Sequence, residues 1–454
     1  MTTTIKNFSK MLVAFVLCAG LVLTSCESAD PVDDNNNSEN TDNSENTDNS
    51  DKPNTNGNIV FADDEIKYFC VRFYDTNGDG EISYSEAAAV EDFYNINENV
   101  NGSIVSFNEF QYFINVRSIP RRCFSGKDKL KSIVLPKSIE TIEWEAFLGC
   151  SALTDINFPQ SLKSIEQYAF SECTGLTNIE FQEGLETIGQ SAFHSCTGLT
   201  NIKFPEGLET IGGSAFYGCT SLTNIELSEG LKTIGQSAFA RCTELTQVEL
   251  PKGLETIEHR AFSECTGLTN IEFQEGLKTI GGSAFEGCTE LTQVELPKGL
   301  ESTGQSAFAR CTELTRVELP EGLKTIGGSA FEGCTGLTNI EFPEGLETIE
   351  DWAFYGCTSL TYIELPEGLE TIKSRAFEYC TKLTQVELPQ SCKKIENSFV
   401  DCDHLSIIFC KALTPPTLWA GWAEDVNVYV PKESVELYKS AAGWKYYNII
   451  GYDF

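Results

Sequence analysis

A 23-residue unit, CTGLTNIEFQEGLETIGQSAFHS at residues 173–195, recurs along most of this chain. Each unit carries a Phe at the same place, and from Cys150 to Cys380 a Cys stands three residues after each Phe. A fixed period of this length indicates a solenoid, in which every unit forms one coil and buries its apolar side against the next. The period is marked by Phe124, Phe147, Phe170, Phe193, Phe216, Phe239, Phe262, Phe285, Phe308, Phe331, Phe354 and Phe377.

Each unit contains two short extended segments. In LTNIEF (176–181) apolar and polar residues alternate, which predicts a strand, and the Pro that follows in most units ends it because Pro has no N–H to donate. GLETIG (184–189) predicts a second extended piece, after which the SAF segment and the Cys complete the coil. The period is typical of leucine-rich repeats. We therefore predict a mainly β solenoid of about 12–13 coils over residues 116–410.

The recurring cysteines predict buried thiols rather than disulfides or metal ligands. Side chains in one column of a solenoid point the same way, whereas a disulfide needs two Cβ atoms that face each other. Free Cys is also among the most buried residue types. The chain has no CxxC pair, and His194, His259 and His404 stand at variable repeat positions, so no zinc site is expected.

Residues 1–25 predict a signal peptide, with a positive start and an apolar stretch too short to span a bilayer comfortably. Leu23-Thr24-Ser25-Cys26 resembles the end of a bacterial lipoprotein signal, which makes Cys26 the lipidated first residue of the mature protein. The alternative is an ordinary signal peptide with an incidental Cys. Lipidation predicts anchoring to the outer membrane at the cell surface without crossing it, although an anchor that faces the periplasm stays open. Residues 26–58, rich in Asp, Asn and Ser, predict a disordered acidic tether.

Residues 59–115 contain DTNGDGEISYSE (75–86), which matches the EF-hand calcium loop. A hard cation needs several oxygens on a tightly turning loop, and apolar periodicity predicts helices on both sides, the second at 87–93. A loop at 97–108 replaces the ligand carboxylates with Asn, so we expect 97–115 to cap the solenoid instead. The alternative for 75–86 is a polar turn without metal. The predicted ligands of one Ca²⁺ are Asp75, Asn77, Asp79, Glu81 through its carbonyl, Ser83 through its hydroxyl or a water, and Glu86 through both carboxylate oxygens.

A column of Glu residues faces out of the predicted sheet, because neighbours on a strand point to opposite sides. Carboxylates about 4.8 Å apart repel one another. One explanation is that tandem duplication copied a solubilising residue; the other is a docking strip on the concave face for a basic protein segment or for divalent cations. The candidate binding residues are Glu180, Glu226, Glu249, Glu272, Glu295, Glu318, Glu341, Glu364 and Glu387, with Arg316 and Tyr362, which interrupt the amide column beside them.

Residues 411–454 leave the repeat and predict a C-terminal cap, with a strand at 426–431 and a helix at 432–441. The repeat unit, the lipoprotein signal, DTNGDGEISYSEAAAV followed by SFNEFQYF, and the TPPTL…VYVP…SVELYKSAAGW ending together resemble BspA-type leucine-rich repeat surface proteins of Bacteroidetes. The resemblance covers nearly all of the mature chain. It implies a right-handed solenoid on a cell-surface lipoprotein, and some members are described as adhesins for host matrix proteins or other bacteria.

Composition narrows the function classes. Removal of Lys6 and Lys10 with the signal takes the formal net charge from −35 to about −37, which disfavours nucleic acid and favours cationic partners. No catalytic dyad, phosphate loop or cofactor fingerprint is present, so no enzyme is expected. We expect a monomeric binding or adhesion module for an extracellular protein ligand, with Ca²⁺ as its one cofactor. The alternative is a glycan-capturing lipoprotein, which needs a row of exposed aromatic residues.

Overall fold

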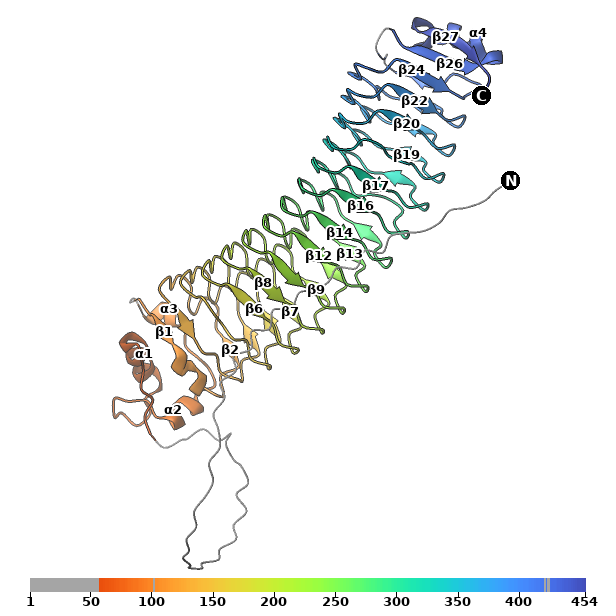
Figure 1. The fold of residues 1–454 in the computed structure, drawn as a ribbon. Helices are drawn as coiled ribbons and strands as arrows, with labels where there is room; N and C mark the ends of the chain where they lie inside the picture. The colour runs from red at the N-terminus through yellow and green to blue at the C-terminus, as the bar shows by residue number, and fades with distance from the viewer. Residues whose placement is uncertain (1–56, 101–102, 420–421, 423–424) are drawn as a thin grey trace, which may run out of the picture. The chain divides into compact units, whose positions relative to one another are not determined.

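A computed structural model describes residues 57–454 except 101–102, 420–421 and 423–424 (Figure 1). The described residues all belong to one compact unit, Pro53–Phe454. The predicted signal peptide, Cys26 and nearly all of the predicted tether therefore lie outside the described residues. Among the described residues, no helix combines the length and the apolar composition that a membrane span requires.

The N-terminal part of this unit is mainly helical. Its elements are α1 (Asp64–Tyr74), α2 (Tyr84–Ala89), α3 (Ile96–Asn99), β1 (Ser106–Phe107) and η1 (Asn108–Tyr112). The helix predicted at 87–93 is wrong in its bounds, because α2 starts earlier and stops at Ala89. Val90 is extended, which carries Phe93 away from the helix and into a cluster with the rings of Phe69 and Phe110.

Each coil of the solenoid contributes up to two short strands, which form two sheet faces. The first face, which carries the Glu column, consists of β1, β3 (Ser132–Ile133), β6 (Asn178–Glu180), β8 (Asn201–Lys203), β10 (Asn224–Glu226), β12 (Gln247–Glu249), β14 (Asn270–Glu272), β16 (Gln293–Glu295), β17 (Arg316–Glu318), β20 (Tyr362–Glu364), β22 (Gln385–Leu388), β24 (Ile407–Cys410), β26 (Asn427–Pro431) and β27 (Asn448–Tyr452). The second face consists of β2 (Ser118–Ile119), β4 (Thr141–Ile142), β5 (Ser164–Ile165), β7 (Thr187–Ile188), β9 (Thr210–Ile211), β11 (Thr233–Ile234), β13 (Thr256–Ile257), β15 (Thr279–Ile280), β18 (Thr325–Ile326), β19 (Thr348–Ile349), β21 (Thr371–Ile372), β23 (Lys394–Ile395) and β25 (Thr417–Leu418).

The paired strands are parallel and each lies in register with the equivalent strand one coil away. On the second face, β2 to β15 form one eight-stranded sheet and β18 to β25 a five-stranded sheet. The first face is divided into shorter ladders, with interruptions between β10 and β12 and between β14 and β16. This parallel arrangement confirms the predicted β solenoid, although the stack has about 15 turns rather than 12–13. The extra turns come from both ends, where β1 pairs with β3 and where β26 pairs with β27 without the repeat sequence.

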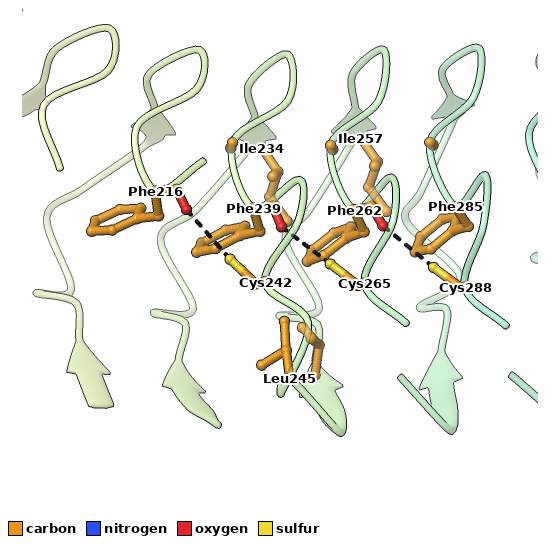
Figure 2. Close-up of a cluster of buried hydrophobic side chains, with 14 of the residues drawn as sticks. Phe216, Ile234, Phe239, Cys242, Leu245, Ile257, Phe262, Cys265, Phe285 and Cys288 are labelled. Atoms are coloured by element: carbon orange, nitrogen blue, oxygen red, sulfur yellow. Dashed lines mark hydrogen bonds between the residues drawn. The ribbon is translucent and has the colours of Figure 1, made fainter. Parts of the chain in front are cut away.

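The core is a stack of Phe rings that runs through consecutive coils (Figure 2). From Phe124–Phe147 to Phe377–Phe399, successive rings lie 4.9 to 5.7 Å apart with interplanar angles of 2° to 12°. Each Cys of the repeat lies beside this stack and donates its thiol to the carbonyl oxygen of the Phe 26 residues earlier, as Cys242 does to Phe216 (Figure 2). All described cysteines are free and buried, which confirms the prediction of structural thiols.

Both ends of the Phe stack are covered. At the N-terminal end, the buried rings of Phe107 and Phe110 each lie 6.5 Å from Phe124. At the C-terminal end, the strand and helix predicted at 426–441 appear as β26, η2 (Lys432–Ser434) and α4 (Val435–Ser440). They are followed by η3 (Trp444–Tyr446), in which buried Trp444 donates its indole N–H to the Pro416 carbonyl at 2.7 Å.

Candidate binding face and calcium loop

The predicted Glu column lies on the first face. In β6, β10, β12, β14, β16 and β17 the Glu is exposed and the Ile or Val before it is buried, as expected from strand alternation. Cα register pairs Glu249 with Glu272, and Glu295 with Glu318. Carboxylates on neighbouring strands therefore stand side by side.

Cations compensate only part of the column. Lys203 Nζ lies 3.2 Å from Glu180, and Arg316 Nη2 lies 2.6 Å from the Glu318 carboxylate. Within the described residues, no Lys or Arg forms a salt bridge with Glu249, Glu272 or Glu295. The predicted site residue Arg316 thus neutralises the edge of a stretch that otherwise stays negative.

Two hollows lie over this stretch of the first face. One, of about 540 Å³, lies over β14, β16 and β17 and is lined by Glu272, Glu295, Glu318 and Arg316. The other, of about 330 Å³, lies over β12 and β14 and shares Glu272 with the first. The two hollows share Glu272, and together they form a groove lined by four Glu residues of the column, with Lys252, Lys298 and Arg316 also in its lining. We call it the acidic groove and define it by Glu249, Glu272, Glu295 and Glu318.

The Glu column ends in an aromatic patch that the sequence analysis did not find. Cα register continues from Glu387 to Phe409 and then to Tyr429. The Phe409 ring lies 4.9 Å from that of Tyr429 and 5.3 Å from that of Tyr452. Tyr362, the other predicted departure, donates its hydroxyl to Glu364 at 3.1 Å. Burial and the nearby Glu387 raise the pKa of Tyr362, so it remains a neutral donor.

The predicted calcium loop forms the turn between α1 and α2. Asp75 accepts hydrogen bonds from the backbone N–H groups of Gly78 at 2.6 Å and Gly80 at 2.9 Å. Asn77 accepts from Asp79 N–H, and Asp79 accepts from Glu81 N–H. Gly80 has a φ of +82°, a region that glycine enters without steric cost. These bonds hold the side chains of the first three predicted ligands on a tight turn.

Glu86 closes the loop from its far end. One carboxylate oxygen accepts from the Thr76 and Asn77 backbone N–H groups, and the other accepts from Ser83 N–H at 2.9 Å. Burial alone would raise the pKa of this carboxyl, but the hydrogen bonds from Ser83 and Thr76 outweigh it and lower the pKa to about 2. Glu86 is therefore ionised over the physiological range.

A short segment before α1 pairs with the loop. Asn58 and Ser83 form an antiparallel bridge, and Ile59 N–H donates to the Ile82 carbonyl at 2.7 Å. The sequence contains no second calcium-binding EF-hand loop that could act as the neighbour of this one. The pairing of residues 57–59 explains how a single loop is held.

The donor set of the loop suits Ca²⁺, which prefers carboxylate, carbonyl and hydroxyl oxygens. Among the described residues, no three His, Cys, Asp or Glu side chains are grouped so that they could hold a metal ion, and this includes Asp75, Asp79 and Glu86. The carboxylates would therefore have to move closer together to bind calcium with Asn77, Ser83 and the Glu81 carbonyl. Lys67 Nζ pairs with the Glu81 side chain at 2.7 Å. The atom of Glu81 that would bind the calcium ion is therefore its backbone carbonyl oxygen.

A second hollow region, at the turns between SAF segments, also escaped the sequence analysis. It has a volume of about 530 Å³ and brings together Tyr168, His194 and Tyr217 from three successive coils. The signal was present in the sequence, because aligning the repeats by their Phe residues places Tyr168, His194 and Tyr217 in two variable columns of three successive coils. Trp352, by contrast, lies in a separate, smaller hollow of about 270 Å³.

The parallel coils and their repeated Leu, Phe and Cys core define a leucine-rich repeat solenoid protein. The family model described as BspA type Leucine rich repeat region matches residues 95–222, 209–335 and 301–415. The chain therefore belongs to the BspA-type leucine-rich repeat family. A leucine-rich repeat protein from Bacteroides ovatus ATCC 8483 is 30% identical over 70% of this chain and 88% of its own, with a TM-score of 0.56. A leucine rich cell surface protein from Faecalibacterium prausnitzii A2-165 is 28% identical over 65% of this chain and 83% of its own, with a TM-score of 0.45. None of the curated proteins compared with the chain matches it.

Proposed function

We propose that this protein is a surface-displayed binding module whose acidic groove binds a basic, extended protein segment. The carrying observation is that Glu249, Glu272 and Glu295 stand together along a groove without a salt bridge in the described part of the chain. Closely spaced like charges cost stability unless a cationic partner or salt relieves them. A Lys- or Arg-rich segment supplies that relief.

The aromatic patch supports an additional apolar contact for the same partner. Phe409, Tyr429 and Tyr452 follow the Glu column on the same face, and Tyr452 and Phe454 are 44% and 52% exposed. Exposed aromatic rings are enriched at protein interfaces because they bury a large area with few rotatable bonds. The partner in this proposal is therefore a basic segment that carries an apolar or aromatic residue at one end.

The proposed location rests on the sequence of the signal. Leu23-Thr24-Ser25-Cys26 supports lipidation of Cys26 and display from the outer membrane, with residues 26–58 as the tether. Fractionation of cells that express a Cys26→Ala variant tests this directly. The variant should leave the membrane fraction, and firm retention there would contradict lipid anchoring.

We further propose that the loop at 75–86 binds one Ca²⁺ as a structural ion. Asp75, Asn77 and Asp79 would contribute side-chain oxygens, Glu81 its carbonyl, Ser83 its hydroxyl or a water, and Glu86 its carboxylate. To coordinate the ion, the Glu86 carboxylate must give up the hydrogen bonds that it accepts from Thr76 and Ser83. The bound ion would add positive charge to the loop that joins α1 to α2 and so stabilise the cap.

The binding proposal is tested with a triple variant in which Glu249, Glu272 and Glu295 become Gln. The probe is a synthetic disordered peptide rich in Lys with one Trp at an end, and binding is followed by fluorescence anisotropy at several salt concentrations. The wild type should bind with an affinity that falls as salt rises, and the variant should bind about tenfold more weakly at low salt. A matched control replaces Glu186, Glu209 and Glu301, which are also exposed but lie beside the second face. Equal weakening in both variants would show that net charge alone, and not the groove, attracts the peptide.

A further inference from the structure

The hollow at the SAF turns, lined by Tyr168, His194 and Tyr217, lies away from the acidic groove and has no part in the function proposed above. It is lined by these half-buried rings and by small residues such as Ser191 and Ser214. We propose that it binds a neutral oligosaccharide.

The large rings are not required by the fold. Tyr168 occupies a column in which six other coils carry Ser, and Tyr217 occupies one in which two other coils carry Ala. Like those Ser residues, Tyr168 has a positive φ, of 56°, a conformation that a bulky side chain seldom adopts. The coil thus holds an aromatic residue at a place where a small one suffices. The Ser residues of that column are Ser191, Ser214, Ser237, Ser283, Ser306 and Ser329.

The rings form an ordered platform. His194 and Tyr217 stack with their centroids 5.0 Å apart and an interplanar angle of 5°. The guanidinium of Arg241 lies 5.6 Å from the Tyr217 centroid and is fixed by a 2.8 Å bond to Glu264. Arg241 therefore lies at the Tyr217 end of this stack. Ser171 and Glu172, which line the hollow, lie at its His194 end.

Polar groups with unused hydrogen-bonding capacity surround these rings. The hydroxyls of Tyr168 and Tyr217 make no hydrogen bond to any described residue, and neither do the side chains of Gln190 and Glu172. Together they offer phenol hydroxyls, an amide and a carboxylate around one hollow of about 530 Å³. Ligand sites typically combine apolar walls with a few such orienting groups.

This combination matches the chemistry of a sugar chain. A pyranose ring presents a C–H face that packs on an aromatic ring, and its edge carries hydroxyls that both donate and accept hydrogen bonds. Glu172 lines the hollow without a salt bridge to a described residue, whereas Glu145 is paired with Arg122; Glu172 and the formal net charge of −35 disfavour uronic or sulfated sugars. The ligand class is therefore a neutral oligosaccharide.

The test measures binding of maltohexaose, cellohexaose, xylohexaose and mannohexaose to the mature protein by calorimetry, with oligogalacturonate as the anionic comparison. At least one neutral sugar should bind, and oligogalacturonate should not. The variants Tyr168→Ser and Tyr217→Ala use residues that other coils carry at the same places, so both should fold. Each should weaken sugar binding by about tenfold, whereas Tyr446→Ala, an exposed Tyr at the C-terminal end, should leave it unchanged.

Three results would overturn the proposal: no binding of any neutral hexaose at millimolar concentration, wild-type affinity in both Tyr variants, or preferential binding of oligogalacturonate. The triple Glu→Gln variant of the acidic groove separates the two sites. It should keep full sugar binding, since Glu249, Glu272 and Glu295 do not line this hollow. Loss of sugar binding in that variant would place the sugar in the acidic groove and contradict the inference.

Discussion

The Sγ atom of Cys265 lies 3.1 Å from the carbonyl oxygen of Phe239 and donates a hydrogen bond to it across two neighbouring coils. The equivalent bond recurs from Cys150 to Cys402, with lengths of 3.1 to 3.4 Å. The Phe239 carbonyl also accepts a hydrogen bond from Cys242 N–H at 3.2 Å, so the thiol is its second donor and at the same time fills apolar space. The repeated Cys is therefore a structural thiol that joins neighbouring coils, and not a redox-active one.

Replacement of Cys265 by Ala should lower stability by about 1–2 kcal/mol, because it removes one of the two hydrogen bonds to the Phe239 carbonyl and leaves a small cavity. Burial also raises the pKa of the Cys265 thiol to about 12, so almost no thiolate forms at neutral pH. Iodoacetamide followed by peptide mapping should find the repeat cysteines unmodified in the native protein and fully modified in guanidinium. Rapid alkylation of Cys265 in the native protein would contradict this account of the core.

The sequence predicted the repeat core and most elements of the caps because both depend on local spacing. The 23-residue recurrence of Phe and Cys is enough to place Phe239 and Cys265 in a buried stack. The hollow around Tyr168 was missed because its walls come from different coils and different positions within the coil. The bounds of α2 were missed for a related reason, since Phe93 leaves the helical path to pack against Phe110, which lies further along the chain.

Replacement of Glu272 by Gln should stabilise the protein by about 0.2–0.5 kcal/mol, because Glu272 lies in register with Glu249 and no described cation pairs with it. The gain should shrink as salt rises. Melting temperatures measured at low and high salt give the comparison. Glu180→Gln is the matched control, because Glu180 pairs with Lys203 at 3.2 Å and should show no gain. A larger gain at Glu180 would mean that repulsion within the column is not the relevant energy.

Thr303 stands where most coils carry a buried Ile, and it disturbs the second face locally. Its Oγ1 accepts a hydrogen bond from Gly327 N–H at 2.8 Å, whereas in a regular coil Gly281 N–H donates to the Ile257 carbonyl. On the second face, the described residues of this coil pair with the next coil through an isolated bridge, Ser302 with Thr325, in place of a two-residue strand. The hydroxyl thus replaces one regular backbone bond.

Thr303→Ile should therefore raise stability by about 1 kcal/mol, since it adds buried apolar area and frees Gly327 N–H for the regular backbone bond. Ile326→Thr is the reverse change at a fully buried position one coil away and should lower stability by about 2 kcal/mol. Denaturant unfolding of the two variants measures both effects. A destabilised Thr303→Ile would show that the hydroxyl bond to Gly327 is the better arrangement for this coil.

The last prediction concerns Glu86, whose two carboxylate oxygens tie the start of the loop at Thr76 to its end at Ser83. Its pKa is lowered from an ordinary value of 4.5 to about 2, so the ionised form stabilises the folded cap. This stabilisation is complete above pH 4.5 and is lost as the pH falls through about 2.

Hydrogen exchange measured between pH 2 and 5, after correction for the intrinsic rate, should show α1 and α2 opening toward the acid end before the Phe stack does. Glu86→Gln should open the same helices at neutral pH and abolish the acid dependence. The exposed Glu91, changed to Gln, should behave as wild type. Added millimolar Ca²⁺ should protect α1 and α2 in the wild type and not in Glu86→Gln, because the ion and the hydrogen bonds use the same carboxylate. Equal protection by Ca²⁺ in both proteins would remove Glu86 from the proposed ligands while leaving its role in the loop intact.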